Sequence, residues 1–333
     1  MGKTIRETLQ EREHQYLSPH AAFSDQTRGR LQPQEPCELR TDFQRDRDRI
    51  IHAKAFRRLM HKTQVFLSPE EDHYRTRLTH TLEVTQIART IARALNLNED
   101  LCEAIGLGHD LGHTPFGHAG ERMLQRCYDA SFTHYQQSLR VVDKLENLNL
   151  TFEVRDGIVN HTNGVSCTLE GRIVRYADKI AYINHDIDDA CRAKVIELDD
   201  IPLMYRNVMG DTSSERIDYM VRSIIEASRD SDDITMKPED AELTEELYRF
   251  LNMRVYHNPV AKGEEGKAEE LLHSLYNYFL KHPEEMPSEY ILISKEEGVP
   301  RAVCDYVSGM SDRYAIHLFR ALFVPEVWGG GIR

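Results

Sequence analysis

The chain has 333 residues, of which 40% are hydrophobic and 29% charged, so it can form one large globular domain or a main domain with a smaller one. Its formal net charge of −13 opposes nucleic-acid binding by the surface as a whole, and a polyanionic ligand would need a local basic patch or a metal ion. Six scattered cysteines without a C-x-x-C pair favour reduced thiols in a cytoplasmic protein. The sequence lacks a signal peptide and any apolar run of about 18–20 residues, so we expect no membrane partner.

The expected secondary structure is almost entirely helical. Residues 1–40 are polar and carry three prolines, which predicts an irregular N-terminal arm. Beyond them, apolar residues recur at helical spacing, and Asn98 is a predicted N-cap. We expect helices over 41–59, 78–96, 99–108, 119–127, 136–147, 172–192 and 243–280, the last with breaks at 258–259 and 263–266. Because alternating apolar and polar runs are rare, we predict an all-α fold with a smaller, mostly helical C-terminal subdomain.

Histidines are concentrated in one part of the chain, since eight of the sixteen lie between residues 73 and 185. His109 and Asp110 follow an apolar helix, and His80 can face His109 across an antiparallel helix pair. Later, Asp178 shares a helix face with Tyr182, His185 and Asp186. Such mixed imidazole and carboxylate sets suit Mn, Fe, Zn or Mg. Periodicity alone leaves open whether this face is solvated, and whether His109-Asp110 or His185-Asp186 binds the metal.

Several motifs, in this order, resemble the HD-domain phosphohydrolases and, more narrowly, the bacterial dGTP triphosphohydrolase-like proteins. The resemblance covers roughly residues 40–320, nearly the whole chain. Its segments are Phe56–Phe66 (FRRLMHKTQVF), Arg75–Val84 (RTRLTHTLEV), Gly108–Glu121 (GHDLGHTPFGHAGE), His134–Val142 (HYQQSLRVV), Tyr176–Tyr182 (YADKIAY) and Asp305–Tyr314 (DYVSGMSDRY).

The resemblance implies an HD-domain helical fold and a division into three parts. These are an N-terminal arm (1–40), an HD catalytic core (41–200) and a C-terminal helical region (201–333) that completes the pocket and the oligomer contacts. The implied metal ligands are His80, His109, Asp110 and Asp178, rather than His185-Asp186. They would hold one divalent ion, Mn, Mg, Fe or Zn, and a further Mg would accompany the nucleotide.

The implied reaction is hydrolysis of a dNTP at the α-phosphorus, which releases the deoxynucleoside and inorganic triphosphate. Because the 5′-oxygen leaves as an alkoxide unless it is protonated, a general acid is valuable. His118 is the candidate acid, with Glu121 three residues later to orient its ring. His134 matches a further active-site histidine of the family, and His113 is expected to support the site or the structure.

Five residues are candidates for binding the substrate. Arg77 lies three residues before His80, which places it near the metal, and Lys179 follows Asp178 and by resemblance contacts phosphate. Tyr182 is expected to stack under the deoxyribose and exclude a 2′-hydroxyl. Gln64 and Asp186 resemble positions that hydrogen-bond the 3′-hydroxyl. The alternative for both cations is an ordinary surface position.

Three matters stay open in the sequence. The basic run from Arg45 to Arg58 is a structural network with Asp42, Asp46 and Asp48, an allosteric nucleotide site between subunits, or a binding site for single-stranded DNA, which the interleaved acids disfavour. The roles of Asp305 and Tyr306 do not follow from their motif. Beside a homo-oligomeric dNTPase, the alternatives are an HD phosphohydrolase for nucleoside monophosphates, cyclic nucleotides or guanosine tetraphosphate, and a regulatory protein that binds nucleotides or single-stranded DNA.

Overall fold

A computed structural model of the chain describes residues 2–64, 75–256 and 259–325. Over these residues the secondary structure consists of helices and two isolated β-bridges, without a β-sheet. The predicted all-α fold is therefore confirmed. The described part contains no helix that is long and apolar enough to cross a membrane, and all six cysteines are free thiols.

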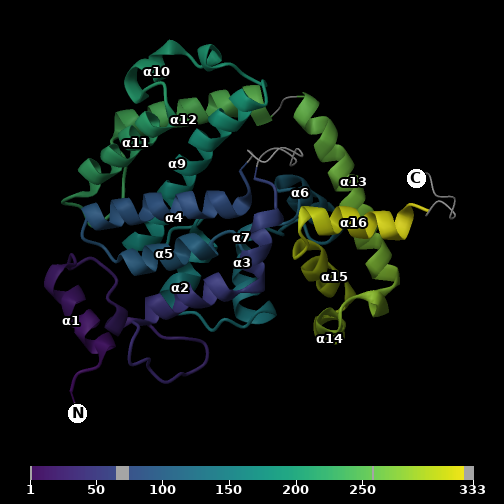
Figure 1. Cartoon of the computed structure of the whole chain (residues 1–333), viewed down its shortest axis with the longest axis horizontal. Coiled ribbons are helices and arrows are strands. Elements are labelled where there is room, and N and C mark those ends of the chain that lie inside the picture. Colours follow the sequence, from purple (N-terminus) through teal and green to yellow (C-terminus); the bar gives the residue numbers. More distant parts are fainter. Residues whose placement is uncertain (1, 65–74, 257–258, 326–333) are drawn as a thin grey trace, which may run out of the picture.

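The helices fall into two groups that lie on opposite sides of Figure 1, connected through α6 and α7. Those of the larger group, together with the two connecting helices, are α1 (Ile5–Tyr16), α2 (Asp42–His52), α3 (Lys54–Arg58), α4 (Arg77–Ala94), α5 (Glu99–Gly108), α6 (His118–Cys127), α7 (His134–Arg140), α8 (Phe152–Asn160), α9 (Leu169–Arg192), α10 (Leu203–Met209), α11 (Ser213–Ser228) and α12 (Pro238–Leu251). Those of the smaller group are α13 (Pro259–Lys281), α14 (Ser288–Glu297), α15 (Val299–Ser308) and α16 (Asp312–Phe323).

Two separate clusters of buried apolar side chains stabilise these groups. The first core joins α2, α4, α5, α8 and α9, and it extends to α11 and α12. The second core joins α13, α15 and α16 to the apolar side of α6, through Phe116, Ala119, Met123 and Leu124. Since burial of apolar surface is the main stabilising term in folding, each core holds its own helices in place. Helix α6 belongs to the second core, although its sequence lies among the segments of the first.

Local capping explains where the helices nearest the site begin. Asn98 accepts hydrogen bonds from the backbone N–H groups of Asp100 and Leu101, so the predicted N-cap of α5 is confirmed. Thr76 likewise accepts from the N–H of Thr79 at the start of α4. These caps fix the ends of an antiparallel pair, and α4 and α5 lie side by side in Figure 1.

Four predictions of secondary structure were wrong in part. The single helix predicted over 41–59 is divided at Ala53, whose extended backbone separates α2 from α3. The N-terminal arm is not wholly irregular, because Thr4 forms a capping box with Glu7 and starts α1. The predicted break at 263–266 is absent, since α13 continues through that run of charges. The helix predicted over 136–147 begins earlier as α7 and then changes to a π-turn at Val141–Leu145. The predicted break at 258–259 lies partly outside the described residues.

Candidate active site

The four predicted metal ligands converge from three helices of the first core. His80 lies in the first turns of α4, His109 and Asp110 follow the last turn of α5, and Asp178 lies on α9. Nε2 of His80 is 3.0 Å from Oδ1 of Asp178. Nε2 of His109 is 3.6 Å from Oδ2 of Asp110 and 4.0 Å from Oδ1 of Asp178. The structure thus brings two imidazoles and two carboxylates to one point.

The orientation of His109 fits a metal ligand. Its Nδ1 is 2.7 Å from the carbonyl oxygen of Gly106, which assigns the ring proton to Nδ1 and the lone pair to Nε2. Nε2 is buried and has no hydrogen-bond partner among the described residues. A buried nitrogen without a partner is costly in an apolar setting, whereas a divalent ion would satisfy it. His80, His109 and Asp110 also form one of the groups whose donor atoms lie within 4.8 Å of one another.

The carboxyl groups of this site are held ionised. Burial tends to raise the pKa of Asp178, but the hydrogen bond with His80 and the nearby charges of His109 and His80 lower it to about 2. Burial likewise tends to raise the pKa of Asp110, and the charges of His109 and Arg77 hold it well below its ordinary value. Both groups are therefore carboxylates at neutral pH, the form that binds cations.

Arg77 is placed differently from a side chain that projects into a substrate pocket. Its Nη1 donates to Oδ2 of Asp110 over 2.5 Å, and its Nη2 donates to the carbonyl oxygen of Thr63 over 3.2 Å. The residue is 3% exposed. In this arrangement Arg77 orients the predicted metal ligand Asp110. Its guanidinium could contact phosphate only while it also bonds Asp110, or after leaving it.

Sequence reasoning missed His161, which completes the cluster. It follows the last residue of α8 just as His109 follows α5, and in both rings Nδ1 is 2.7 Å from the carbonyl oxygen three residues earlier. The ring centroids of His109 and His161 lie 5.0 Å apart, and these two histidines and Asp178 have donor atoms within 4.8 Å of one another. Burial, together with the charges of His109 and His134, lowers the pKa of His161 to about 4, so the ring is neutral. The only signal in the sequence was a second histidine at a helix end.

The predicted catalytic residues form an adjoining group. Nδ1 of His118 is 3.2 Å from Oε2 of Glu121, and Nδ1 of His134 is 3.2 Å from Oε1 of the same carboxyl group. The His134 backbone N–H also donates to Oε1 over 2.9 Å. Burial tends to raise the pKa of Glu121, but hydrogen bonds from both histidines outweigh it and lower the pKa. His113 stacks on His134 with ring centroids 4.6 Å apart.

Exposure separates the roles that these histidines can take. The side chain of His118 is 71% exposed, whereas that of His134 is 10% exposed. Burial lowers the pKa of His134, but the hydrogen bond and charge of Glu121 raise it more, so the ring takes up a proton more readily than usual. A ligand can reach His118 directly, and Glu121 orients both rings.

A backbone contact attaches α7 to the turn that carries His109. Ser138 donates its hydroxyl to the carbonyl oxygen of His109 over 2.7 Å and accepts from the Gly112 N–H over 2.9 Å. A Cβ atom at Gly112 would lie 2.0 Å from the backbone nitrogen of Ser138, so only glycine fits there. This contact fixes His134, at the start of α7, relative to the metal-ligand cluster.

The candidate substrate residues on α9 lie next to α12. Nζ of Lys179 forms an ion pair with Glu245 over 2.6 Å, and the ring of Tyr182 meets that of Tyr248 edge-on at 5.7 Å. Asp186 is buried one turn after Tyr182. Nearer the N-terminus, the buried Oε1 of Gln64 has no hydrogen-bond partner in the described part of the chain.

His185 is not part of the metal-ligand cluster. Its Nε2 is 3.0 Å from Oε2 of Glu83, and none of the groups of converging donors in the described residues includes His185 or Asp186. This geometry agrees with the prediction that His109-Asp110, rather than His185-Asp186, is the metal pair.

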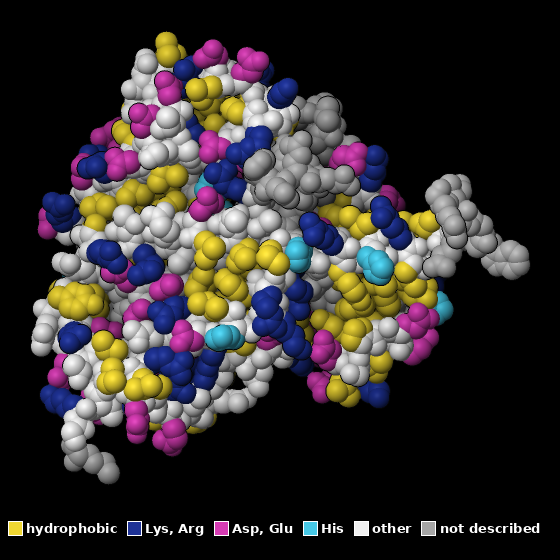
Figure 2. Space-filling view, viewed as in Figure 1, with side chains coloured by type: hydrophobic (Ala, Val, Ile, Leu, Met, Phe, Trp, Pro, Cys, Tyr) yellow, Lys and Arg dark blue, Asp and Glu magenta, His cyan; other side chains and the backbone are white. Residues whose placement is uncertain are grey.

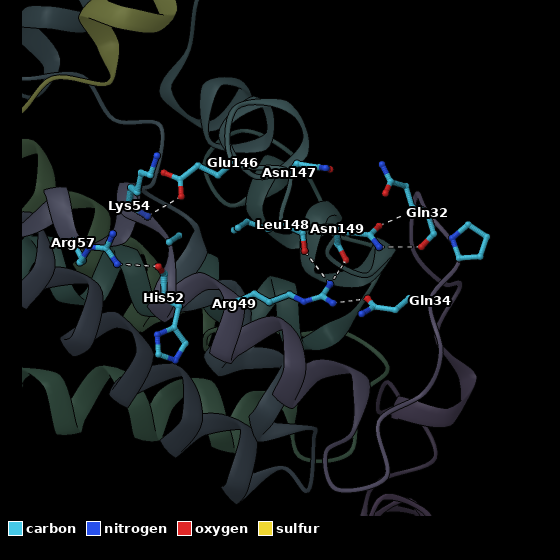
Figure 3. A pocket seen from close by; sticks show the side chains of 12 residues that line it. Gln32, Gln34, Arg49, His52, Lys54, Arg57, Glu146, Asn147, Leu148 and Asn149 are labelled. Atoms are coloured by element: carbon cyan, nitrogen blue, oxygen red, sulfur yellow. Dashed lines mark hydrogen bonds between the residues drawn. The ribbon is translucent and has the colours of Figure 1, made fainter. Parts of the chain in front are cut away.

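The basic run from Arg45 to Arg58 borders a pocket of about 680 Å³ between α2, α3 and the segments 32–34 and 146–149. Figure 3 shows that both of its arginines are engaged, since Arg49 donates to the carbonyl oxygens of Leu148 and Asn149 and Arg57 donates to that of His52. Lys54 is bonded to Glu146 through its backbone N–H. Elsewhere in the run, Arg47 pairs with Asp48. These bonds favour the structural network among the three interpretations, although the pocket has room for an anion.

Comparisons with known proteins agree with this geometry. Residues 77–183 match the HD domain, and residues 234–321 match the phosphohydrolase-associated domain. Proteins called deoxyguanosinetriphosphate triphosphohydrolase-like protein are 54% identical to this chain in Caldanaerobacter subterraneus, 47% in Desulfatibacillum aliphaticivorans and 46% in Clostridium perfringens. Each alignment covers 97% of this chain and, respectively, 97%, 99% and 98% of the relative. The predicted family is therefore confirmed, and the chain belongs to the deoxyguanosinetriphosphate triphosphohydrolase-like proteins, a family of HD-domain phosphohydrolases.

Proposed function

We propose that this protein is a metal-dependent dNTP triphosphohydrolase that cleaves dNTPs into the deoxynucleoside and inorganic triphosphate. The observation that carries the proposal is the convergence of His80, His109, Asp110 and Asp178 beside His118 and Glu121. The names of the relatives support a nucleoside triphosphate as the substrate. The protein is expected to act in the cytoplasm.

The four residues His80, His109, Asp110 and Asp178 would hold one divalent ion, Mn, Mg, Fe or Zn, and a further Mg would arrive with the nucleotide. The two carboxylates would balance the charge of the ion, and the orphaned Nε2 of His109 would complete its binding. When bound, such an ion lowers the pKa of water and neutralises charge on a phosphoryl group.

His118 is the proposed general acid. Its exposed ring can reach the 5′-oxygen of a bound nucleotide and protonate it as the bond to phosphorus breaks. Glu121 holds the ring through Nδ1, which leaves Nε2 to face the substrate. His134 shares the same carboxylate and, with its raised pKa, is a second proton donor beside the first.

The α9 face is the proposed binding surface for the nucleotide. Lys179 would bind the triphosphate after leaving Glu245, and Tyr182 would pack against the deoxyribose, where a 2′-hydroxyl would clash. Gln64 and Asp186 are proposed to bind the 3′-hydroxyl, and the unpartnered Oε1 of Gln64 supports a ligand there. The Arg77 side chain would act on phosphate only by extending beyond its bond to Asp110.

The protein is further proposed to form a homo-oligomer. Figure 2 shows hydrophobic side chains gathered over α2 to α5, and the exposed ones on these helices and the turn after α3 include Ile51, Met60 and Leu82. A groove of about 490 Å³ beside them is lined by Phe56 and Leu107. Contiguous exposed apolar surface favours association. The pocket of Figure 3 is a candidate position for an activating nucleotide in such an assembly.

The test is a hydrolysis panel with purified protein, each of the four dNTPs, and Mn²⁺ or Mg²⁺. The proposal expects inorganic triphosphate from at least one dNTP. Release of only orthophosphate or pyrophosphate would contradict it, and the panel should then extend to nucleoside monophosphates, cyclic nucleotides and guanosine tetraphosphate. Binding of single-stranded DNA without hydrolysis, weakening as salt rises, would instead support the regulatory alternative.

A further inference from the structure

A buried carboxylate of the C-terminal region is bonded to two distant segments of the active site. Asp312, at the start of α16, is 6% exposed. Its Oδ1 accepts the N–H of Phe116 over 2.9 Å, and its Oδ2 accepts the N–H of Thr63 over 2.8 Å together with the Thr63 hydroxyl. A carboxylate is suited to this arrangement because it only accepts hydrogen bonds and has two oxygens to offer.

The segment bonded through Phe116 is a strained turn immediately before His118. Phe116 and Gly117 have φ angles of 60° and 59°, in the left-handed region that a residue other than glycine rarely adopts. Gly117 is the N-cap of α6, whose first residue is His118, and it provides no side-chain cap. The turn must therefore be held by its surroundings, and Asp312 is bonded to the backbone two residues before His118.

Neighbouring contacts from α15 fix the other segments of the same group. Nζ of the buried Lys62 donates to the carbonyl oxygens of His113 and Ser308, the latter over 3.0 Å. Asp305 accepts from Gln137 over 2.9 Å, and Arg140 also donates to it. Because Gln137 and Arg140 belong to α7, which begins with His134, the contacts from α15 and α16 reach both helices that carry the proposed acid–base residues.

We propose that Asp312 is a positioning residue for the acid–base pair His118–Glu121. Its carboxylate holds the Phe116–Gly117 turn in the conformation that starts α6 at His118, so the ring meets Glu121 in a fixed orientation. The inference rests on the proposed function, since it assigns Asp312 to the reaction rather than to folding alone. Asparagine at this position has one carbonyl oxygen, and its NH₂ group cannot accept the second N–H.

A matched control is available in Asp46. It is also a buried aspartate that accepts a backbone N–H, from Thr151 over 2.7 Å, and it pairs with Arg30. Neither partner is a proposed site residue. Asp46→Asn and Asp312→Asn therefore each weaken the capping of a buried backbone N–H, one away from the site and one within it. Asp46→Asn also removes the charge that pairs with Arg30, so it is the more severe change of the two for stability.

The experiment measures thermal stability, bound Mn²⁺, kcat and KM for both variants with the dNTP that the wild type hydrolyses best. Both variants are expected to lose stability. For Asp312→Asn, kcat is expected to fall about 10- to 100-fold, because small misplacements of a reacting group are costly, while KM and bound Mn²⁺ stay close to wild type. Asp46→Asn is expected to keep kcat within about twofold of wild type.

A second readout needs no substrate. In protein with ¹³C-labelled histidine, the His118 ring signal can be assigned with His118→Ala, and it should shift in Asp312→Asn but not in Asp46→Asn. This readout decides the inference even if the hydrolysis panel overturns the proposed function. Should Asp312→Asn not fold, Asp312→Glu, which keeps both oxygens, is compared in the same way.

Three results would overturn the inference. The first is an unchanged kcat and His118 signal in a folded Asp312 variant of reduced stability, which would make the carboxylate structural only. The second is a loss of bound Mn²⁺ in proportion to activity, since that would place the effect at the metal ligands, through Thr63 and Arg77. The third is an equal loss of kcat in Asp46→Asn.

Discussion

The metal-ligand cluster and the acid–base group lie side by side but are anchored in different cores. His80, His109, Asp110 and Asp178 project from α4, α5 and α9, whose apolar faces form the first core. His118 and Glu121 project from α6, whose apolar face packs into the second core against α13 and the helices beyond. The candidate active site therefore lies at the boundary between the two cores.

If the proposed roles hold, metal binding and proton transfer depend on different parts of the chain. A change near the first core should act on metal content, whereas a change near the second core should act on kcat with the metal retained. The first two variants below test that separation, the later ones each probe one side of it, and all follow in order of decreasing expected effect.

Asp178→Ala should have the largest effect. It removes one of two carboxylates of the cluster, so bound metal and activity should fall together, activity by about a thousandfold or more because metal stabilisation of the transition state is worth several kcal/mol. Metal analysis, hydrolysis rate and circular dichroism measure this. Asp188→Ala is the control, because Asp188 lies on the same helix and pairs with Arg75 and Arg216 instead. Wild-type metal content in Asp178→Ala would contradict the ligand assignment.

Glu121→Gln should lower kcat about 10²- to 10⁴-fold, the usual range for losing general acid–base catalysis, and leave bound metal unchanged. The glutamine side chain has one oxygen that can accept a hydrogen bond, so it cannot accept from both His118 and His134. Glu269→Gln is its control, since Glu269 pairs with Arg122 on the outer side of the same helix α6. If metal content fell as far as kcat, the two groups of residues would not be separable.

Lys179→Met should raise KM about 10- to 100-fold, because a charge-assisted hydrogen bond to phosphate is worth about 1.5–3 kcal/mol. Glu245→Gln should lower KM a few-fold, since it removes the carboxylate that competes with phosphate for Lys179. Initial rates over a range of substrate concentrations measure both. An unchanged KM in both variants would exclude Lys179 from phosphate binding.

Glu297→Gln should have the smallest effect, a change in how the stability of the smaller helix group depends on pH in acid. Hydrogen bonds from Arg140 and Lys144 lower the pKa of Glu297 from 4.5 to about 2. Stability from these pairs is thus complete above pH 4.5 and is lost as the pH falls toward 2. The side chain is partly exposed, so the difference should be about 1 kcal/mol or less. Urea unfolding at pH 7 and pH 3 gives the free energy of unfolding at each pH. This free energy should fall less between pH 7 and pH 3 in the variant than in the wild type, and an equal fall in both proteins would contradict the prediction.

The sequence predicted the local features well. Helical periodicity located α4, α5 and α9, and the Asn98 cap needed only the four residues around it. The clustering of histidines indicated a metal site, and the family resemblance then selected His80, His109, Asp110 and Asp178 as the predicted ligands. These are signals of short range, and periodicity and capping are physical properties of short segments.

Long-range packing could not be predicted in the same way. Nothing within 119–127 indicates that α6 packs on a helix some 140 residues later, or that Asp312 is bonded to Phe116 across 196 positions. His161 was missed because a single histidine after α8 gives no spacing pattern. The helix in the N-terminal arm was missed because the prolines that follow its capping box favour irregular structure for the arm as a whole.

The glycine at position 112 limits how far α7 can move against the turn that carries His109. Main chain meets main chain there with no side chain between, and two hydrogen bonds through Ser138 close the contact. Such an interlock opposes sliding and rotation of α7 against the turn after α5, so we expect His134 and His109 to keep a fixed separation.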